Sequence, residues 1–282
     1  MDASGAVKPW DECFDTYLIE LEDGPTLFLL DMHAAPHAPL ASHPIRLAVR
    51  VTMKSPRPDG LRSREESEAL FELEHALVAA LATLGFHYVG RSVGQGFMDA
   101  FFFGPRGVAE PDIQRVVTPR QGDYTLELEL EEDPGWSVYF DWLYPPELHC
   151  HLMSNRNLLD LLTKQGDRSE VVREVDHLAY FPDLDKATRA AAQLAKQGFK
   201  VSPPRAPEAP ATGWALSFTR EDSLAEGRAD EVTVEILEVL RAHEGDYDGW
   251  GCLVTTWRGS CPRVSPWSRG GGILRVPRRT SQ

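Results

Sequence analysis

The fold of the C-terminal half is decided by residues 171–202, which read VVREVDHLAYFPDLDKATRAAAQLAKQGFKVS. Residues 171–180 are expected to form a strand. Asp183 or Asp185 can cap the helix that follows, where alanines and leucines recur at helical spacing up to a terminating glycine. A second strand is expected over 199–202. This strand–helix–strand order is the first half of a compact α+β unit.

The rest of the C-terminal half supplies what is needed to complete that unit. Strands are expected over 214–219 and 247–257, on either side of a helix that Asp230 can cap. The resulting order, βαββαβ, is the one that packs two helices on one face of an antiparallel sheet. We therefore predict a ferredoxin-like α/β sandwich in residues 170–257.

The N-terminal half shows a similar order with extra strands, which predicts a second α+β unit in residues 10–145. Its clearest helix begins at Ser63-Arg64-Glu65-Glu66, a sequence typical of a capping box. Near the end of this half, a turn at Asp133-Pro134-Gly135 leads into a segment, Trp136–Trp142, that is expected to be a strand.

The two expected units are joined by a segment that begins with Pro145-Pro146. Its leucines have helical spacing, so we expect a linking helix in residues 146–169 and a boundary between the halves near 164–170. The fold class predicted for the whole chain is therefore α+β, with two ferredoxin-like units.

Charge is distributed unevenly along the 282 residues. The chain has 43 acidic and 29 basic residues and a net charge of −14, yet residues 258–282 carry six arginines and no acid. The part before them therefore has a net charge of −20, which repels phosphate backbones and favours cationic partners. A nucleic-acid contact is expected only through this arginine-rich tail. The tail lacks apolar periodicity and is expected to be disordered.

Other protein classes are disfavoured by simple absences in the sequence. No apolar run is long enough for a membrane helix, and the first residues do not resemble a signal peptide, so the cytoplasm is the expected location. The four cysteines form no C-x-x-C pair, so free thiols are expected rather than structural zinc. Nucleophile-elbow and nucleotide-binding motifs are missing, and we expect neither catalysis nor a cofactor.

Histidines leave one enzymatic alternative open. His33, His37 and His43 crowd one loop of the N-terminal half, although Pro36 disfavours a helix that would bring the first two to one face. A metal-dependent enzyme that uses these histidines is the less favoured hypothesis, and no metal site is assigned.

The most unusual local stretch is Tyr247-Asp248-Gly249-Trp250-Gly251. It can be a packed turn that supplies a core tryptophan. It can also be an exposed aromatic and acidic ridge that docks a protein partner, since aromatic residues are enriched at binding hot spots. The residues alone do not decide between these interpretations.

With this motif, residues 171–257 resemble the family of regulators of ribonuclease E activity, type B. The other pieces that carry the resemblance are Val175-Asp176-His177-Leu178 and the run from Ala191 through Leu194 to Gly198-Phe199-Lys200-Val201. The resemblance implies a non-catalytic protein inhibitor that binds the non-catalytic region of the endoribonuclease and changes RNA decay.

Residues 10–145 resemble a bacterial domain family of unknown function that is often found ahead of that regulator. The similar features include Asp59-Gly60-Leu61 and Trp142-Leu143-Tyr144-Pro145. This second resemblance implies no activity.

We therefore expect a cytoplasmic regulator that binds a basic protein, with a ribonuclease E-like scaffold as the candidate partner. An immunity- or stress-type binding module on the same fold is the alternative. The residues expected to contact the partner are Tyr247, Asp248, Trp250, His177, Glu235 and Glu238.

Overall fold

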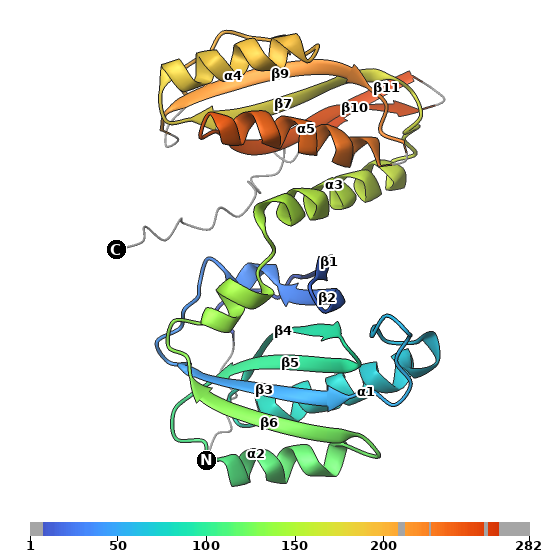
Figure 1. Ribbon diagram of the computed structural model, residues 1–282, viewed down its shortest axis with the longest axis vertical. Helices are drawn as coiled ribbons and strands as arrows, with labels where there is room; N and C mark the ends of the chain where they lie inside the picture. The colour runs from blue at the N-terminus through green and yellow to red at the C-terminus, as the bar shows by residue number, and fades with distance from the viewer. Residues whose placement is uncertain (1–7, 208–211, 226, 257–258, 265–282) are drawn as a thin grey trace. The chain divides into compact units, whose positions relative to one another are not determined.

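The computed structural model describes residues 8–207, 212–225, 227–256 and 259–264 (Figure 1). The chain divides into two compact units, Met1–Pro145 and Pro146–Gln282. The boundary thus lies before the helix expected to link the halves, and not near residues 164–170. None of the helices in the described ranges is long and apolar enough to cross a membrane.

The first unit is built on a six-stranded antiparallel sheet in the order β1-β2-β4-β5-β3-β6. The segment β3-α1-β4-β5-α2-β6 has the ferredoxin-like order, with β1 and β2 added beyond β4. The strands are β1 (Phe14–Leu21), β2 (Gly24–Asp31), β3 (Ile45–Thr52), β4 (His87–Gly94), β5 (Phe97–Gly104) and β6 (Thr125–Glu132); the helices are η1 (Met32–Ala34), α1 (Arg64–Ala82), α2 (Glu110–Val117), η2 (Thr118–Arg120) and the π-helix η3 (Val138–Leu143).

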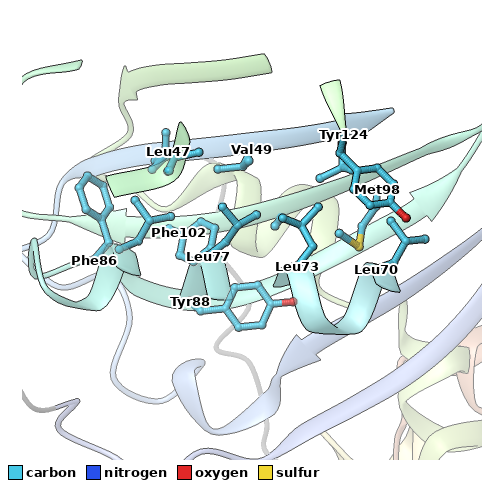
Figure 2. Packing of buried hydrophobic residues seen from close by; sticks show 14 of the residues in the cluster. Leu47, Val49, Leu70, Leu73, Leu77, Phe86, Tyr88, Met98, Phe102 and Tyr124 are labelled. Carbon is cyan, nitrogen blue, oxygen red and sulfur yellow. The ribbon is translucent and has the colours of Figure 1, made fainter. Parts of the chain in front are cut away.

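The core of the first unit lies between this sheet and helices α1 and α2. Figure 2 shows Leu70, Leu73 and Leu77 of α1 packed with side chains from β3 and β5. Leu77 is fully buried. The leucine spacing of α1 therefore predicted the buried face of the helix correctly.

The start of α1 differs from the expected capping box. Ser63 precedes the helix but makes no side-chain capping hydrogen bond. Glu66, which is buried, instead accepts hydrogen bonds from the backbone N–H groups of Lys54 and Ser55, at 2.7 and 2.8 Å. The Glu66 carboxylate therefore stabilises the loop after β3 and does not cap the start of α1.

The segment expected to be a strand over Trp136–Trp142 is the π-helix η3. Trp136, the first residue of this segment, has a φ of 55°, in the left-handed region that a strand residue does not adopt. The fully buried Trp136 ring stacks on Phe103 at 4.1 Å, and its N–H donates to the His43 carbonyl at 2.9 Å. Long-range packing of this tryptophan thus overrides the local alternation.

The second unit is built on a five-stranded antiparallel sheet in the order β11-β10-β7-β9-β8. The segment β7-α4-β8-β9-α5-β10 again has the ferredoxin-like order. The strands are β7 (Arg173–Phe181), β8 (Lys200–Val201), β9 (Trp214–Asp222), β10 (Asp246–Thr256) and β11 (Gly259–Val264); the helices are α3 (Glu147–Lys164), α4 (Leu184–Lys196) and α5 (Arg228–Ala242).

Helix starts in the second unit agree with the sequence in one of two cases. Asp183 caps α4 by accepting a hydrogen bond from the Lys186 N–H at 2.8 Å, as predicted. Helix α5 begins earlier than expected, after Gly227 at a φ of 78°, so Asp230 lies inside its first turn and is not its cap.

Helix α3 belongs to the packing of the second unit. Its Leu158 and Leu162 are buried in one cluster with Trp250 and Cys252 of β10. It is therefore a third helix of this unit and not a free linker.

The arginine-rich tail begins with a strand. Residues 259–264 form β11, which pairs with β10, so the expectation that 258–282 contain no regular element is wrong for this part. Residues 265–282 lie outside the described residues.

Candidate protein-docking surface

The motif Tyr247–Gly251 lies on β10, and a β-bulge decides where its side chains point. The register against β7 shifts between Tyr247 and Gly249, where Gly249 has a φ of 103°. Residues three apart lie on opposite faces of a regular strand. The extra residue in the bulge brings both Tyr247 and Trp250 to the helix-covered face. They are only 6% and 3% exposed, so neither forms part of an exposed ridge.

His177 is buried beside them. Its Nδ1 lies 2.7 Å from the Tyr247 hydroxyl, and its ring stacks on Phe218 at 5.2 Å. Burial, and then the positive charge of Arg220, lower the pKa of His177 to about 3. Burial raises the pKa of Tyr247 well above its usual value. Both side chains are therefore uncharged at neutral pH and act as a packed polar pair in the core.

Trp250 connects three elements through a residue that the sequence analysis missed. Its indole N–H donates to Asn155 Oδ1 of α3 at 2.7 Å. The Asn155 amide donates to Asp230 at 2.8 Å and Thr233 at 3.0 Å, both on α5. Asn155 is 3% exposed, and the only signal for it was a polar residue within a leucine-spaced helix. This network orients α3 and α5 against β10.

The remaining predicted contacts lie at the surface but do not form one site with the motif. Asp248 is half-buried in the bulge. Glu235 of α5 accepts from Arg220 at 3.0 Å and lies 3.5 Å from Arg228, whereas Glu238 is exposed. The structure therefore separates the six predicted residues into a buried group, Tyr247, Trp250 and His177, and a surface group, Asp248, Glu235 and Glu238.

The opposite side of the sheet is partly exposed and carries acidic and apolar side chains. Because residues alternate between faces, the residues of β7 between the buried ones point away from the helices. We call this side the open face. Its residues are Glu174, Asp176, Leu178 and Tyr180 of β7, Ser217, Thr219 and Glu221 of β9, and Leu253 of β10.

Two carboxylates of the open face are cross-strand partners. Glu174 and Glu221 lie directly opposite each other, and both are exposed. Like charges in this position are destabilising. Asp176 follows on the same face of β7, and Leu253, which is 40% exposed, comes directly after Cys252, the β10 residue that pairs with Val175. Lys200 of β8 lies one strand further away, opposite Thr219. A cation from a partner would relieve the repulsion between the two glutamates.

The histidines expected for a metal-dependent enzyme face different partners. His43 is buried and stacks on His87 at 4.2 Å, His37 stacks on Trp10 at 5.5 Å, and His33 Nδ1 lies 2.9 Å from the Asp11 carbonyl. Across the described ranges, no three His, Cys, Asp or Glu side chains are grouped as metal ligands would be.

The solved structures that match this chain include two distant likenesses. An unknown protein from Galdieria sulphuraria is 12% identical, with 72% of this chain and 95% of that one covered and a TM-score of 0.21. A VAO-type flavoprotein from Myceliophthora thermophila is 13% identical, with 72% of this chain and 39% of that one covered and a TM-score of 0.27. These scores are too low to carry an argument. No curated protein matches the chain.

Family models match both units. Residues 12–144 match a family of unknown function, DUF695, and residues 152–252 match the family "Regulator of ribonuclease activity B". The second match begins within α3, which agrees with the packing of this helix in the second unit. The first unit thus matches the model of the DUF695 family and the second matches the model of the regulators of ribonuclease activity B, as the sequence motifs indicated.

Proposed function

We propose that the second unit binds a basic protein partner in the cytoplasm, and that this partner is an endoribonuclease of the ribonuclease E type, whose action on RNA is thereby inhibited. The observation that carries the proposal is the match of residues 152–252 to a family of ribonuclease regulators. The acidic character of the chain before its arginine-rich tail supports a cationic partner.

The open face is the contact surface that the geometry favours. It combines apolar side chains, Leu178, Tyr180 and Leu253, with carboxylates at one end. Protein interfaces combine apolar contacts with polar and charged groups in this way. The opposed Glu174 and Glu221 offer two acceptors for an arginine side chain, which binds carboxylates with several donors at once.

In this proposal the buried motif has a positioning role. Tyr247, Trp250 and His177 fix the bulged strand β10 against β7 and the helices. They thereby hold the open face in shape without touching the partner. Glu235 and Glu238 of α5 lie on the helix side of the sheet and serve as a comparison surface.

The test measures binding of the full chain to the purified arginine-rich, non-catalytic region of ribonuclease E by isothermal titration calorimetry. The variant Glu174→Gln/Asp176→Asn/Glu221→Gln removes the charge of the open face, and we expect it to weaken binding about 10-fold or more. The matched control Glu231→Gln/Glu238→Gln removes exposed charge from α5, and we expect its dissociation constant to stay within about twofold of wild type.

Two results would contradict the proposal in different ways. Absence of binding by the wild-type chain at low salt would refute the ribonuclease partner and favour an immunity- or stress-type module. Binding that is weakened by the α5 control and not by the open-face variant would move the contact to the exposed side of α5, where Glu231 and Glu238 lie. A rise in salt from about 50 to 300 mM should slow association, because exposed charges are screened.

A further inference from the structure

An open cavity of about 430 Å³ lies on the sheet of the first unit. Leu47, Val49 and Val51 of β3 pack toward α1 and α2, so the alternate residues of this strand face the cavity from the other side of the sheet. The lining comes from three strands and the π-helix η3. Its residues are Ala48, Arg50, Asp99, Phe101, Glu127, Leu128, Glu129, Val138 and Trp142.

Two neighbouring rows of the sheet form the floor. In one row Ala48 lies between Phe101 and Glu129, and in the next Arg50 lies between Asp99 and Glu127. The side chain of Ala48 is short, so the cavity is deepest between Phe101 and Glu129. Val138 and Trp142 of η3 form a wall above it. A π-helix is rare and is found frequently at functional sites.

The charges of the lining do not balance. Arg50 is already engaged by Asp99 through two hydrogen bonds, at 2.7 and 3.0 Å. Glu129 accepts a hydrogen bond from Arg46 at 3.1 Å. Glu127 is exposed and makes no hydrogen bond or ion pair with another described residue. With Arg46 on Glu129 and Arg50 on Asp99, the cavity keeps one carboxylate, Glu127, that the charge of the neighbouring Arg50 attracts but that no guanidinium of the described residues binds by a hydrogen bond or ion pair. This carboxylate can accept a cation from a ligand.

An aromatic surface faces the same space. Trp142 is 42% exposed, although tryptophan is seldom left in water, and its ring packs edge-on against Phe28 at 5.2 Å. A flat aromatic ring beside carboxylates is the environment that suits guanidinium, which stacks on the ring and donates to oxygens in its own plane. An anion would meet three carboxylates and a guanidinium that is already paired.

We propose that this cavity binds a guanidinium group carried on an aliphatic chain, with the cation between Glu127 and Trp142 and the chain over Ala48 and Phe101. The group can come from a small free molecule or from an arginine side chain of a protein. This inference concerns the first unit alone and does not depend on the ribonuclease partner.

The test titrates the full chain by calorimetry with two probes, agmatine and the peptide N-acetyl-Gly-Arg-Gly-amide, with sodium benzoate as the anionic comparison. We expect at least one cationic probe to bind with a dissociation constant below about 1 mM. Tighter binding of agmatine assigns the site to a free molecule, and tighter binding of the peptide assigns it to an arginine side chain; both outcomes support the cation site.

Variants locate the binding. Glu127→Gln replaces an exposed carboxylate by a neutral amide of nearly the same shape, and should weaken the binding of the cationic probe about fivefold or more. Trp142→Ala removes the aromatic ring and should weaken this binding further. Glu131→Gln is the matched control, because Glu131 lies on the same strand and pairs with Arg46 but does not line the cavity. Circular dichroism checks that each variant is folded.

Three outcomes would overturn the inference. They are no heat with either cation up to about 10 mM, binding of benzoate in preference to the cations, and equal effects of Glu127→Gln and Glu131→Gln.

Discussion

Replacement of Trp250 by phenylalanine tests whether the indole serves the core, as its burial indicates, or a partner. The substitution keeps an aromatic ring and removes the N–H that donates to Asn155 Oδ1 at 2.7 Å. Because Trp250 is 3% exposed, water cannot reach the abandoned amide oxygen easily. The unsatisfied acceptor should cost about 1–3 kcal/mol and the smaller ring about 1 kcal/mol, a loss of about 2–4 kcal/mol in all.

A double-mutant cycle isolates the hydrogen bond from the change in volume. Asn155→Leu alone leaves the indole N–H of Trp250 without its acceptor and also removes the hydrogen bonds to Asp230 and Thr233, so it should cost at least as much. In the double variant both groups are apolar, so the cost should fall below the sum of the single costs by about 1–2 kcal/mol.

Hydrogen exchange read by mass spectrometry is the appropriate assay. The two units can unfold separately, so a single melting curve of the full chain does not define one free energy. Exchange of the amides in Asp246–Thr256 reports the opening free energy of β10 directly. Trp142→Phe, a substitution in the other unit, should leave this exchange unchanged. The reasoning fails if the two single effects are additive within about 0.5 kcal/mol, or if Trp250→Phe abolishes partner binding while exchange is unaltered.

Three further predictions concern caps, the core and pH. Asp183→Ala should destabilise the second unit by about 1 kcal/mol, whereas Ser63→Ala, which removes no cap, should change the first by less than about 0.5 kcal/mol in urea titrations. Leu77→Ala should cost the first unit about 2–5 kcal/mol, as measured by exchange of α1 amides, and a smaller value would mean that the core collapses around it. Burial lowers the pKa of His177 to about 3 and that of His87 to about 4. As the pH falls, these histidines take up protons in the unfolded chain before they do so in the folded one. The free energy of unfolding should therefore be unaffected by them above about pH 6.5. Below that pH it should fall by roughly 1.4 kcal/mol per histidine per pH unit, until the pH reaches the folded pKa of about 3 for His177 and about 4 for His87. His177→Gln should flatten this decline in the second unit, and an unchanged slope would refute the assignment.

Sequence patterns predicted the elements where local and long-range preferences agree. Both βαββαβ orders, the buried face of α1 and the cap of α4 follow from periodicity and from Asp183. The segment after Gly135 was mispredicted because its aromatic residues alternate as in a strand, yet Trp136 is held against Phe103 by packing from another strand. Glu66 was misassigned for the same reason, since its hydrogen-bond donors belong to a loop near β3.

The candidate surface was harder to predict than the fold, because the face on which a side chain lies depends on the register. A one-residue irregularity exchanges the two faces of a strand. Without the bulge at Asp248, Tyr247 and Trp250 would lie on opposite faces, and one aromatic ring would be exposed. The sequence Asp-Gly is compatible with a tight turn as well as with a bulge, so the residues alone could not settle which aromatic side chains a partner would meet.

The bulge also explains why the most specific motif of the second unit is a poor guide to its partner. Tyr247 and Trp250 join the bulged β10 to His177 and Asn155 inside the core, where a partner does not reach them. The motif therefore identifies the fold. Glu174 and Glu221 of the open face, in contrast, are exposed and are not part of the core. They lie directly opposite each other on the adjacent strands β7 and β9, where their like charges repel. If the partner is basic, the unfavourable pair is what binding relieves, and specificity should reside in these residues rather than in the motif.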